Sequence, residues 1–200
     1  MNQWKIAPQP LAGGWLENAK KVPSPNQDER PKGEISLLVI HCISLPPGEF
    51  GGGHIDRLFC NDLSPDTHPY FREISALKVS AHLLIDRLGG LTQYVPFQRR
   101  AWHAGISRFG ERERCNDFSI GIELEGTESL PYTGVQYLRL AEVAATLIHH
   151  YPQLTSERIV GHCDIAPGRK TDPGESFDWR LFHDLLSGLI RHPASDESRL

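Results

Sequence analysis

The strongest constraint on the fold is an unbroken apolar run that ends in a histidine. Residues 37–40 are all apolar, His41 follows them, and two prolines and a glycine occupy positions 46–48. Because no polar residue interrupts the run, it predicts a strand covered on both faces, near the centre of a sheet. The prolines cannot continue the hydrogen bonding of a strand. We therefore expect His41 to lie at the C-terminal end of a central strand.

A second strand is predicted at residues 119–125, where apolar and polar residues alternate. Successive side chains of a strand point to opposite faces. One face carries Ile120, Ile122 and Leu124, and the other carries Ser119, Gly121, Glu123 and Glu125. The two glutamates share a face, so the alternation alone does not say which of them would serve a site.

The remaining pattern predicts shorter strands. Residues 79–86 and 91–95 read as two strands joined by a glycine-containing hairpin, and residues 158–162 read as another strand that ends at His162. The long loop at 51–76 is predicted to contain a short helix at 55–59, and loops of that length in a compact domain usually serve function.

Two amphipathic helices are predicted in the C-terminal half. Thr133 and Gln136 fit a capping box that opens a helix running to about His150, with Tyr132 and Tyr137 as its hydrophobic staple. Its predicted apolar stripe is Leu138, Ala141, Ala145 and Ile148. A second helix begins near Phe177 and is ended by Pro193, with the apolar face Leu181, Phe182, Leu185, Leu186, Leu189 and Ile190.

Strands interrupted by two such helices predict a single-domain α/β (α+β) protein whose central mixed sheet is flanked by helices. Residues 1–34 are rich in Pro, Gly, Asn and charge, and we expect an irregular N-terminal arm that wraps the domain, with one helical turn near residues 15–20. The domain proper is predicted at 35–192 and a polar tail at 193–200.

Charge and hydropathy exclude several classes of partner. The chain has 25 acidic and 21 basic residues and a net charge of -4, so we expect no nucleic-acid partner and no anionic membrane. No apolar run approaches the roughly 20 residues that span a bilayer, and the first residues lack the apolar stretch of a secretory signal. The sequence thus predicts a cytoplasmic protein with four reduced cysteines. It does not predict an oligomeric state.

The ten histidines raise the question of a metal site. Catalytic zinc commonly takes three ligands from histidine and carboxylate, and it leaves one position open. His41 and His162 each end a predicted strand, and Asp172 follows His162 across a proline-containing loop that can fold back. The three side chains are therefore a candidate zinc site at one edge of the sheet. The competing interpretation is that each histidine is a hydrogen-bonded core residue.

Four blocks of sequence carry a resemblance to a known family. The blocks are residues 39–50, 101–105, 114–126 and 161–174. In this order they resemble the amidase_2 family of zinc amidases, and within it the cytoplasmic enzymes of bacterial cell-wall recycling. The family also includes phage lysozyme-type amidases and peptidoglycan recognition proteins. The resemblance extends roughly from Gly14 to His183.

The resemblance implies a function and a set of site residues. The reaction would be hydrolysis of the amide between N-acetylmuramic acid, favoured in its 1,6-anhydro form, and L-alanine of the stem peptide, so the partner would be a small anhydromuropeptide. An indirect effect on β-lactamase induction would follow. By matching position, the Zn²⁺ ligands would be His41, His162 and Asp172, with Glu123 as the acid–base carboxylate and Lys170 as the cation beside the metal. Arg114 and Tyr70 would bind substrate.

One residue departs from the family pattern. The family usually has asparagine after the first zinc histidine, and this chain has Cys42. Cys42 and Cys163 each follow a proposed ligand, which suggests a thiol nucleophile as an alternative. Neighbouring residues of a strand face opposite ways, so the Cys42 thiol is expected to point away from the site.

The other residues of the motifs have structural interpretations. We expect His82 and His103 to have closed structural roles beside the site, and Glu125 to be a strand-end group. Two rival functions stay open: a peptidoglycan-binding module without catalysis, and a phage or exported amidase that digests the polymeric wall. The presence of all three ligands, Glu123 and Lys170 favours an enzyme over a binding module.

Overall fold

The structure is a computed structural model, and it describes residues 11–191. Its centre is a six-stranded sheet with the strand order β12-β5-β11-β6-β7-β3. The strands are β12 (Ile159–Gly161), β5 (Leu37–Ile43), β11 (Ser119–Glu125), β6 (Leu83–Ile85), β7 (Leu91–Gln93) and β3 (Lys20–Lys21). The predicted tail at 193–200, which includes Pro193, lies outside the described residues, as does His192.

The sheet is mixed, as the sequence predicts. β5 pairs in parallel with β11 and β12, β11 pairs in parallel with β6, and β6 pairs antiparallel with β7. His41 of β5 is in register with Glu123 of β11. Side chains at paired positions of neighbouring strands project from the same face of a sheet, so these two side chains lie next to each other. β5 continues two residues past His41, to Ile43, because the first proline comes only at position 46.

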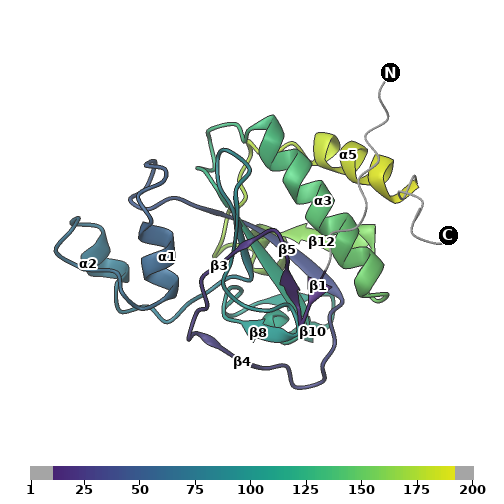
Figure 1. The fold of residues 1–200 in the computed structure, drawn as a ribbon, viewed down its shortest axis with the longest axis horizontal. Helices are drawn as coiled ribbons and strands as arrows, with labels where there is room; N and C mark the ends of the chain where they lie inside the picture. Colours follow the sequence, from purple (N-terminus) through teal and green to yellow (C-terminus); the bar gives the residue numbers. More distant parts are fainter. Residues whose placement is uncertain (1–10, 192–200) are drawn as a thin grey trace.

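Two helices cover one face of the sheet, α3 (Gly134–His150) and α5 (Trp179–Arg191), and they lie side by side (Figure 1). The sheet residues under them are Leu38, Ile40, Ile120, Ile122 and Leu124, all fully buried. The intervening residues of β5, Leu37, Val39 and His41, therefore project from the opposite face. A separate apolar cluster that includes Leu37, Val39 and Ile165 covers that face beside the histidine.

The predicted start of α3 is confirmed, but its predicted stripe is partly wrong. The Thr133 hydroxyl accepts from the backbone N–H of Gln136, and the Gln136 side chain accepts from the N–H of Thr133. The Tyr132 and Tyr137 rings stack edge to face. Leu138, however, is 36% exposed. The buried stripe is Tyr137, Leu140, Ala141, Ala144 and Leu147, with Ala145 and Ile148 partly buried at its edge.

α5 begins at Trp179, two residues later than predicted. Phe182 and Leu186 are buried and Leu185 and Leu189 are partly buried against the core, whereas Leu181 and Ile190 are 39% and 40% exposed. The predicted apolar face was too wide because α5 packs chiefly on α3 and buries only a narrow seam.

The N-terminal arm pairs with the domain as short strands, and the helical turn predicted near residues 15–20 is wrong. β1 (Leu11–Ala12) and β2 (Trp15–Leu16) form a hairpin, β3 joins the edge of the main sheet, and β4 (Gln27–Glu29) pairs with β8 (Arg99–Ala101). Gly13 and Gly14 have φ of 58° and 79°, the left-handed region that glycine enters without strain, and this pair turns the hairpin. The predicted domain boundaries at 34 and 192 stay predictions.

The remaining elements are short. They are α1 (His54–Phe59), α2 (Phe71–Ile74), β9 (Arg108–Phe109), β10 (Arg112–Glu113), α4 (His162–Ile165) and the 3-10 turns η1 (Cys115–Asp117) and η2 (Ser156–Arg158). The helix expected at 55–59 is thus confirmed as α1. β6 and β7 form the predicted antiparallel pair, over fewer residues than expected.

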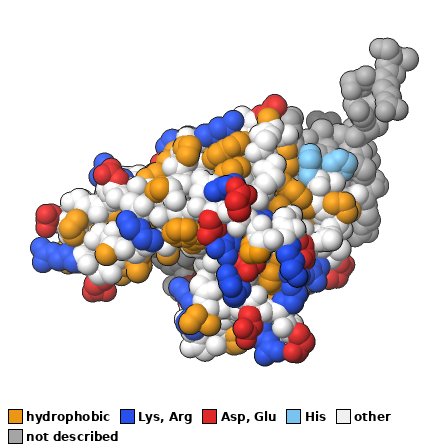
Figure 2. Space-filling view, turned by 90° about the horizontal axis from the view of Figure 1, so that it is seen from below, with side chains coloured by type: hydrophobic (Ala, Val, Ile, Leu, Met, Phe, Trp, Pro, Cys, Tyr) orange, Lys and Arg blue, Asp and Glu red, His pale blue; other side chains and the backbone are white. Residues whose placement is uncertain are grey.

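Among residues 11–191, no helix combines the length and the hydropathy needed to cross a membrane. On the face seen in Figure 2, acidic and basic side chains are interspersed rather than gathered into a field of one sign. The expectations of no nucleic-acid and no membrane partner stay predictions.

Candidate metal centre

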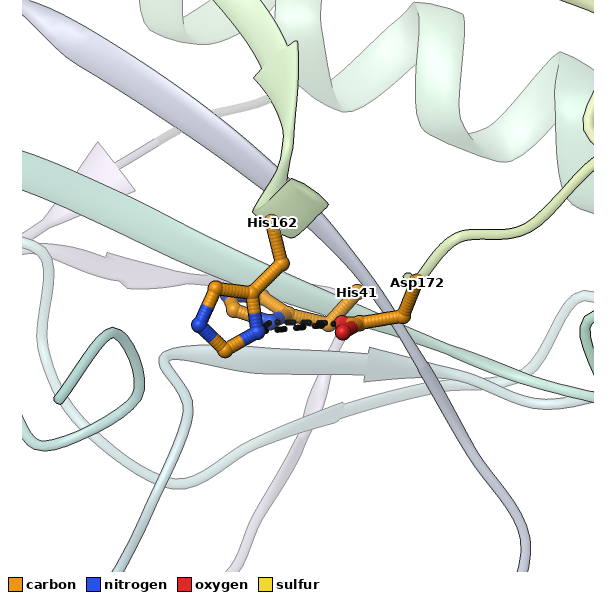
Figure 3. Close-up of side chains that lie close together, drawn as sticks. All are labelled: His41, His162 and Asp172. Carbon is orange, nitrogen blue, oxygen red and sulfur yellow. Dashed lines mark hydrogen bonds and ion pairs between the residues drawn. The ribbon is translucent and has the colours of Figure 1, made fainter. Parts of the chain in front are cut away.

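Three side chains from distant parts of the sequence converge at one end of β5 (Figure 3). His41 Nδ1 lies 3.0 Å from His162 Nδ1 and 3.1 Å from Asp172 Oδ2, and His162 Nδ1 lies 3.2 Å from the same oxygen. All three residues are buried. The structure therefore brings together the three ligands predicted from the sequence, and we call this group the metal triangle.

The predicted position of His162 needs one correction. β12 ends at Gly161, and His162 is the first residue of α4 rather than the last residue of the strand. Residues next to His162 stabilise this change from strand to helix. The Asp164 carboxylate accepts a hydrogen bond of 2.7 Å from the Gly161 N–H, as a capping residue does at a helix start. The helix directs the imidazole back across the end of β5.

Hydrogen bonding alone cannot satisfy the metal triangle. An ionised carboxylate only accepts, so both ring nitrogens would have to donate to Asp172, and the two N–H groups would then oppose each other across 3.0 Å. A cation removes the conflict. Zn²⁺ with ligand distances of about 2.0–2.2 Å in a tetrahedron would have ligand atoms about 3.3–3.6 Å apart, slightly more than the observed 3.0–3.2 Å. Two histidines and one aspartate, with further positions open, are a zinc donor set.

The ionisation of the metal triangle suits a metal as well. Burial lowers the pKa of His41 to about 4, so its imidazole is neutral at pH 7. Burial by itself raises the pKa of Asp172, but hydrogen bonds from His162 and His41 outweigh it and hold that pKa well below its usual range. Metals bind the neutral imidazole and the ionised carboxylate, so little proton release opposes binding at neutral pH.

The outer nitrogens of both histidines have partners. His41 Nε2 lies 2.8 Å from His103 Nδ1, and His103 Nε2 lies 3.1 Å from the Ser119 hydroxyl. His162 Nε2 donates to the backbone carbonyl of Ala104 at 3.2 Å. His82 is fully buried, accepts from the Gly121 N–H, and has its ring centroid 5.8 Å from that of His103, so both predicted structural histidines lie beside the site.

Arg30 is a residue that sequence reasoning missed. It comes from the polar N-terminal arm, yet it is buried and its guanidinium donates to the backbone carbonyls of Phe97, Asn116 and Ser119 and contacts His82 Nε2. No local pattern marks it, because its neighbours in sequence are charged and proline-rich like any solvated segment.

Glu123 lies beside the metal triangle, and its carboxyl group is available for proton transfer. It is buried, and its Oε2 has no hydrogen-bond partner among the described residues. Burial, reinforced by the negative charge of Asp172, raises its pKa well above the usual value, while Lys170 opposes this shift. A carboxyl group with a raised pKa and an open oxygen is suited to exchange protons near pH 7.

Glu125 shares the face of β11 with Glu123 but has a different task. One of its oxygens accepts from the N–H of Gly51 at 2.6 Å and the other from the N–H of Arg87 at 3.2 Å. These bonds tie two loops to the end of β11. The structure thus distinguishes the two glutamates, which the alternation could not.

The other predicted site residues lie on loops. Lys170 is exposed, and its charge influences both Glu123 and His41. Arg114 is exposed with left-handed backbone (φ 62°) and lines a cavity of about 470 Å³ together with Ile165. Ile165 belongs to α4, the helix that His162 begins, but neither the metal triangle nor Glu123 lines this cavity.

The contacts of Tyr70 are with an apolar cluster and not with the metal triangle. It packs against the apolar cluster of Leu58, Phe59 and Phe71, where α1 and α2 meet. Its predicted contact with substrate stays a prediction.

Cys42 points away from the metal triangle, as expected for the residue after His41. Its side chain packs against the core on the helix-covered face, and burial raises the pKa of its thiol to about 12. The thiol hydrogen-bonds with the Tyr132 hydroxyl, which donates to the carbonyl of Pro173 at 2.7 Å. Cys42 therefore stays a thiol, and Tyr132 fixes the loop that carries Asp172.

Two imidazoles and a carboxylate whose ligand atoms converge next to a glutamic acid with an unpaired oxygen are typical of metal-dependent hydrolases. Comparison with known proteins narrows this class. Residues 31–175 match amidase_2, the family described as N-acetylmuramoyl-L-alanine amidase. The chain belongs to the amidase_2 family.

Individual relatives agree with this assignment. The chain is 60% identical over 175 residues to the 1,6-anhydro-N-acetylmuramyl-L-alanine amidase AmpD of Salmonella typhimurium (strain SL1344), covering 87% of this chain and 93% of the relative. A crystal structure of a selenomethionine derivative of AmpD superimposes with a TM-score of 0.87 at 58% identity, over 89% of this chain and 99% of that one. The predicted fold class is thereby confirmed.

A more distant neighbour carries a ligand. It is the N-acetylmuramyl-L-alanine amidase AmiD of E. coli in complex with the substrate anhydro-N-acetylmuramic acid-L-Ala-D-gamma-Glu-L-Lys, with a TM-score of 0.55 at 32% identity. The match covers 76% of this chain and 57% of that one.

Proposed function

We propose that this protein hydrolyses the amide between 1,6-anhydro-N-acetylmuramic acid and the L-alanine of a stem peptide, with Zn²⁺ held by His41, His162 and Asp172. The observation that carries the proposal is the buried metal triangle next to the unpaired Glu123. The names of the AmpD relatives and the ligand of the AmiD complex support the choice of substrate.

An unstrained amide has a weakly electrophilic carbonyl and a poor amine leaving group, so both ends need assistance. Bound zinc supplies a Lewis acid for the carbonyl and lowers the pKa of water toward 7. Glu123 takes the proton of the attacking water and delivers one to the departing alanine nitrogen. The raised pKa lets the same carboxyl group hold that proton between the two steps.

Two cations are proposed to assist the reaction. Lys170 lies where its charge reaches both Glu123 and His41, so it stabilises the negative charge that develops on the carbonyl oxygen. Arg114, on the rim of the cavity that Ile165 also lines, offers a guanidinium to the carboxylates of the stem peptide. Tyr70 is proposed as a further substrate contact.

The biological setting is proposed from the same resemblance. A small anhydromuropeptide is a product of wall breakdown, so the reaction belongs to peptidoglycan recycling in the cytoplasm. Removing the stem peptide would lower the amount of intact anhydromuropeptide and so affect β-lactamase induction indirectly.

The decisive experiment measures release of the stem peptide from anhydromuramyl-tripeptide by the purified protein. We expect release that stops with a chelator and returns with added Zn²⁺. Asp172→Ala should lose both zinc and activity, because only two ligands remain. Cys42→Ser is the matched control and should keep its zinc, since the thiol faces the core.

Two results would contradict the proposal. Zinc-loaded protein that binds the tripeptide and releases nothing would favour the non-catalytic binding module. Release only from polymeric wall, and not from the soluble tripeptide, would favour the wall-digesting amidase.

A further inference from the structure

One two-residue segment holds the outer nitrogens of both histidines of the metal triangle. The segment is His103 and Ala104, which follow β8. The His103 ring meets His41 Nε2 at 2.8 Å, and the Ala104 carbonyl meets His162 Nε2 at 3.2 Å. The two imidazoles come from different elements, so the segment is a shared support.

The direction of each hydrogen bond follows from the chemistry of the partners. A carbonyl only accepts, so His162 carries its proton on Nε2, and its Nδ1 presents a lone pair to the metal triangle. For His41 to do the same, its Nε2–H must donate to His103 Nδ1. His103 then carries its own proton on Nε2 and donates it to the Ser119 hydroxyl at 3.1 Å. The chain of donors is consistent from the metal triangle to β11.

The segment is itself fixed at several points. The side-chain oxygen of Asn116 accepts from the backbone N–H groups of His103 and Ala104, at 3.2 and 2.8 Å. Arg169 donates to the second lone pair of the Ala104 carbonyl at 2.7 Å. A Cβ at Gly121 would come within 2.5 Å of the His103 ring, so the absence of a side chain there leaves room for the imidazole against β11.

We propose that the His103–Ala104 segment, held by Asn116, is the positioning element of the zinc centre, and that it fixes the tautomer and orientation of both histidine ligands. The inference rests on the proposed zinc site. His103 is a positioning residue, because it acts through His41. Outer partners of metal-bound histidines typically affect metal affinity 10- to 100-fold.

The first test replaces the ring. His103→Leu removes the acceptor for His41 and fills similar space, whereas His103→Gln keeps a side-chain oxygen that can accept from Nε2–H. We expect His103→Leu to lower zinc affinity about 10- to 100-fold, measured by competition with a chromogenic chelator, and His103→Gln to recover much of the loss.

A spectroscopic measurement separates positioning from general loosening. In the zinc-free protein Asp172 and His103 compete for the proton of the neutral His41 ring, so long-range ¹H–¹⁵N NMR spectra should show a larger fraction of His41 protonated on Nε2 in the wild type than in His103→Leu. Ser80→Ala is the control, because the Ser80 hydroxyl accepts from the neighbouring N–H of Trp102 without touching the metal triangle. It should leave both the zinc affinity and the His41 tautomer unchanged.

The second pair of variants acts on the backbone of the segment. Asn116→Asp keeps an oxygen acceptor for both N–H groups, and Asn116→Leu removes it. We expect zinc affinity to fall in Asn116→Leu and to be largely retained in Asn116→Asp.

The outcomes separate this inference from the proposed function. A wild-type protein that binds no zinc would overturn the proposed zinc site itself. If the wild type binds zinc and His41→Ala abolishes binding, but His103→Leu keeps the wild-type affinity and tautomer, the positioning role alone is wrong.

Discussion

Two glutamates on one strand illustrate how environment assigns a role to a residue. Glu123 and Glu125 have the same side chain and project from the same face of β11. Each oxygen of Glu125 accepts from a backbone N–H, whereas Glu123 keeps an oxygen without a partner and has a raised pKa next to the metal triangle. Glu123 therefore combines an oxygen that has no partner among the described residues with an environment that favours its protonated form.

Glu123→Gln should retain zinc and lose activity. The amide has nearly the same shape but cannot shuttle protons, so we expect kcat to fall by about 10²- to 10⁴-fold at unchanged zinc content. Glu125→Gln is the matched control and should keep most of its turnover. The assignment would be reversed if Glu125→Gln were inactive and Glu123→Gln were not.

Glu123 should also make the stability of the zinc-free protein depend on pH. Its pKa in the folded protein lies above the unfolded value of 4.5, so the folded state holds this proton more tightly. Its contribution to stability is present at low pH and is lost as the pH rises through the folded pKa. Glutamine does not titrate, so the Tm of Glu123→Gln relative to wild type should increase from pH 5 to pH 8. A difference in Tm that is independent of pH would show that the folded pKa is ordinary.

At the scale of elements, α3 is attached to the sheet through its first turn. The Gln136 side chain is fully buried and donates to the carbonyls of Glu125 and Ile85, at the ends of β11 and β6, while it also caps Thr133. The capping box therefore holds the helix and the site-bearing strand in one network.

Gln136→Leu should destabilise the protein more than loss of the cap hydroxyl does. It leaves two buried carbonyls and one N–H unpaired, which costs about 2–4 kcal/mol of the free energy of unfolding. Thr133→Ala removes the capping bond and the bond from the hydroxyl to the Arg87 carbonyl, and it should cost about 1–2 kcal/mol. Urea unfolding of both variants measures the difference, and equal losses would mean that Gln136 acts only as part of the cap.

Helices and strands are predicted well where the sequence pattern depends only on residues of the same segment. β11 has the predicted bounds, and the capping box of α3 forms as expected. The errors arose where a partner far away in sequence decides the outcome. The arm became strands because β7 and β8 offer edges to pair with, and Leu138 is exposed because α5 and the sheet together set the buried stripe.

The convergence of the site was predictable for a related reason. His41 lies near the C-terminal end of the central strand β5, and β12 pairs in parallel with β5, so the residue after β12 reaches the same edge of the sheet. The support by His103, Ala104 and Arg30 was not predictable, because it depends on how loops fold over that edge. The roles of the metal triangle and of the other site residues stay proposals.

At the scale of the whole molecule, zinc should act as a stabiliser of the fold. The three ligands span residues 41 to 172, so the unfolded chain cannot present them together. A ligand that binds only the folded state at 1,000 times its Kd adds about 4 kcal/mol to the free energy of unfolding. We expect a zinc-dependent rise in Tm that a chelator reverses and that Asp172→Ala lacks. A rise of the same size in Asp172→Ala would place the bound zinc elsewhere.

Arg30 has a consequence for how the chain can be cut or fused. The family match begins at residue 31, immediately after this arginine. A fragment trimmed to that boundary would leave the carbonyls of Phe97, Asn116 and Ser119 without their donor, beneath the residues that support the two histidines. The smallest fragment that keeps these carbonyls paired therefore begins upstream of the family boundary, and a tag or protease site is better placed before the arm than within it.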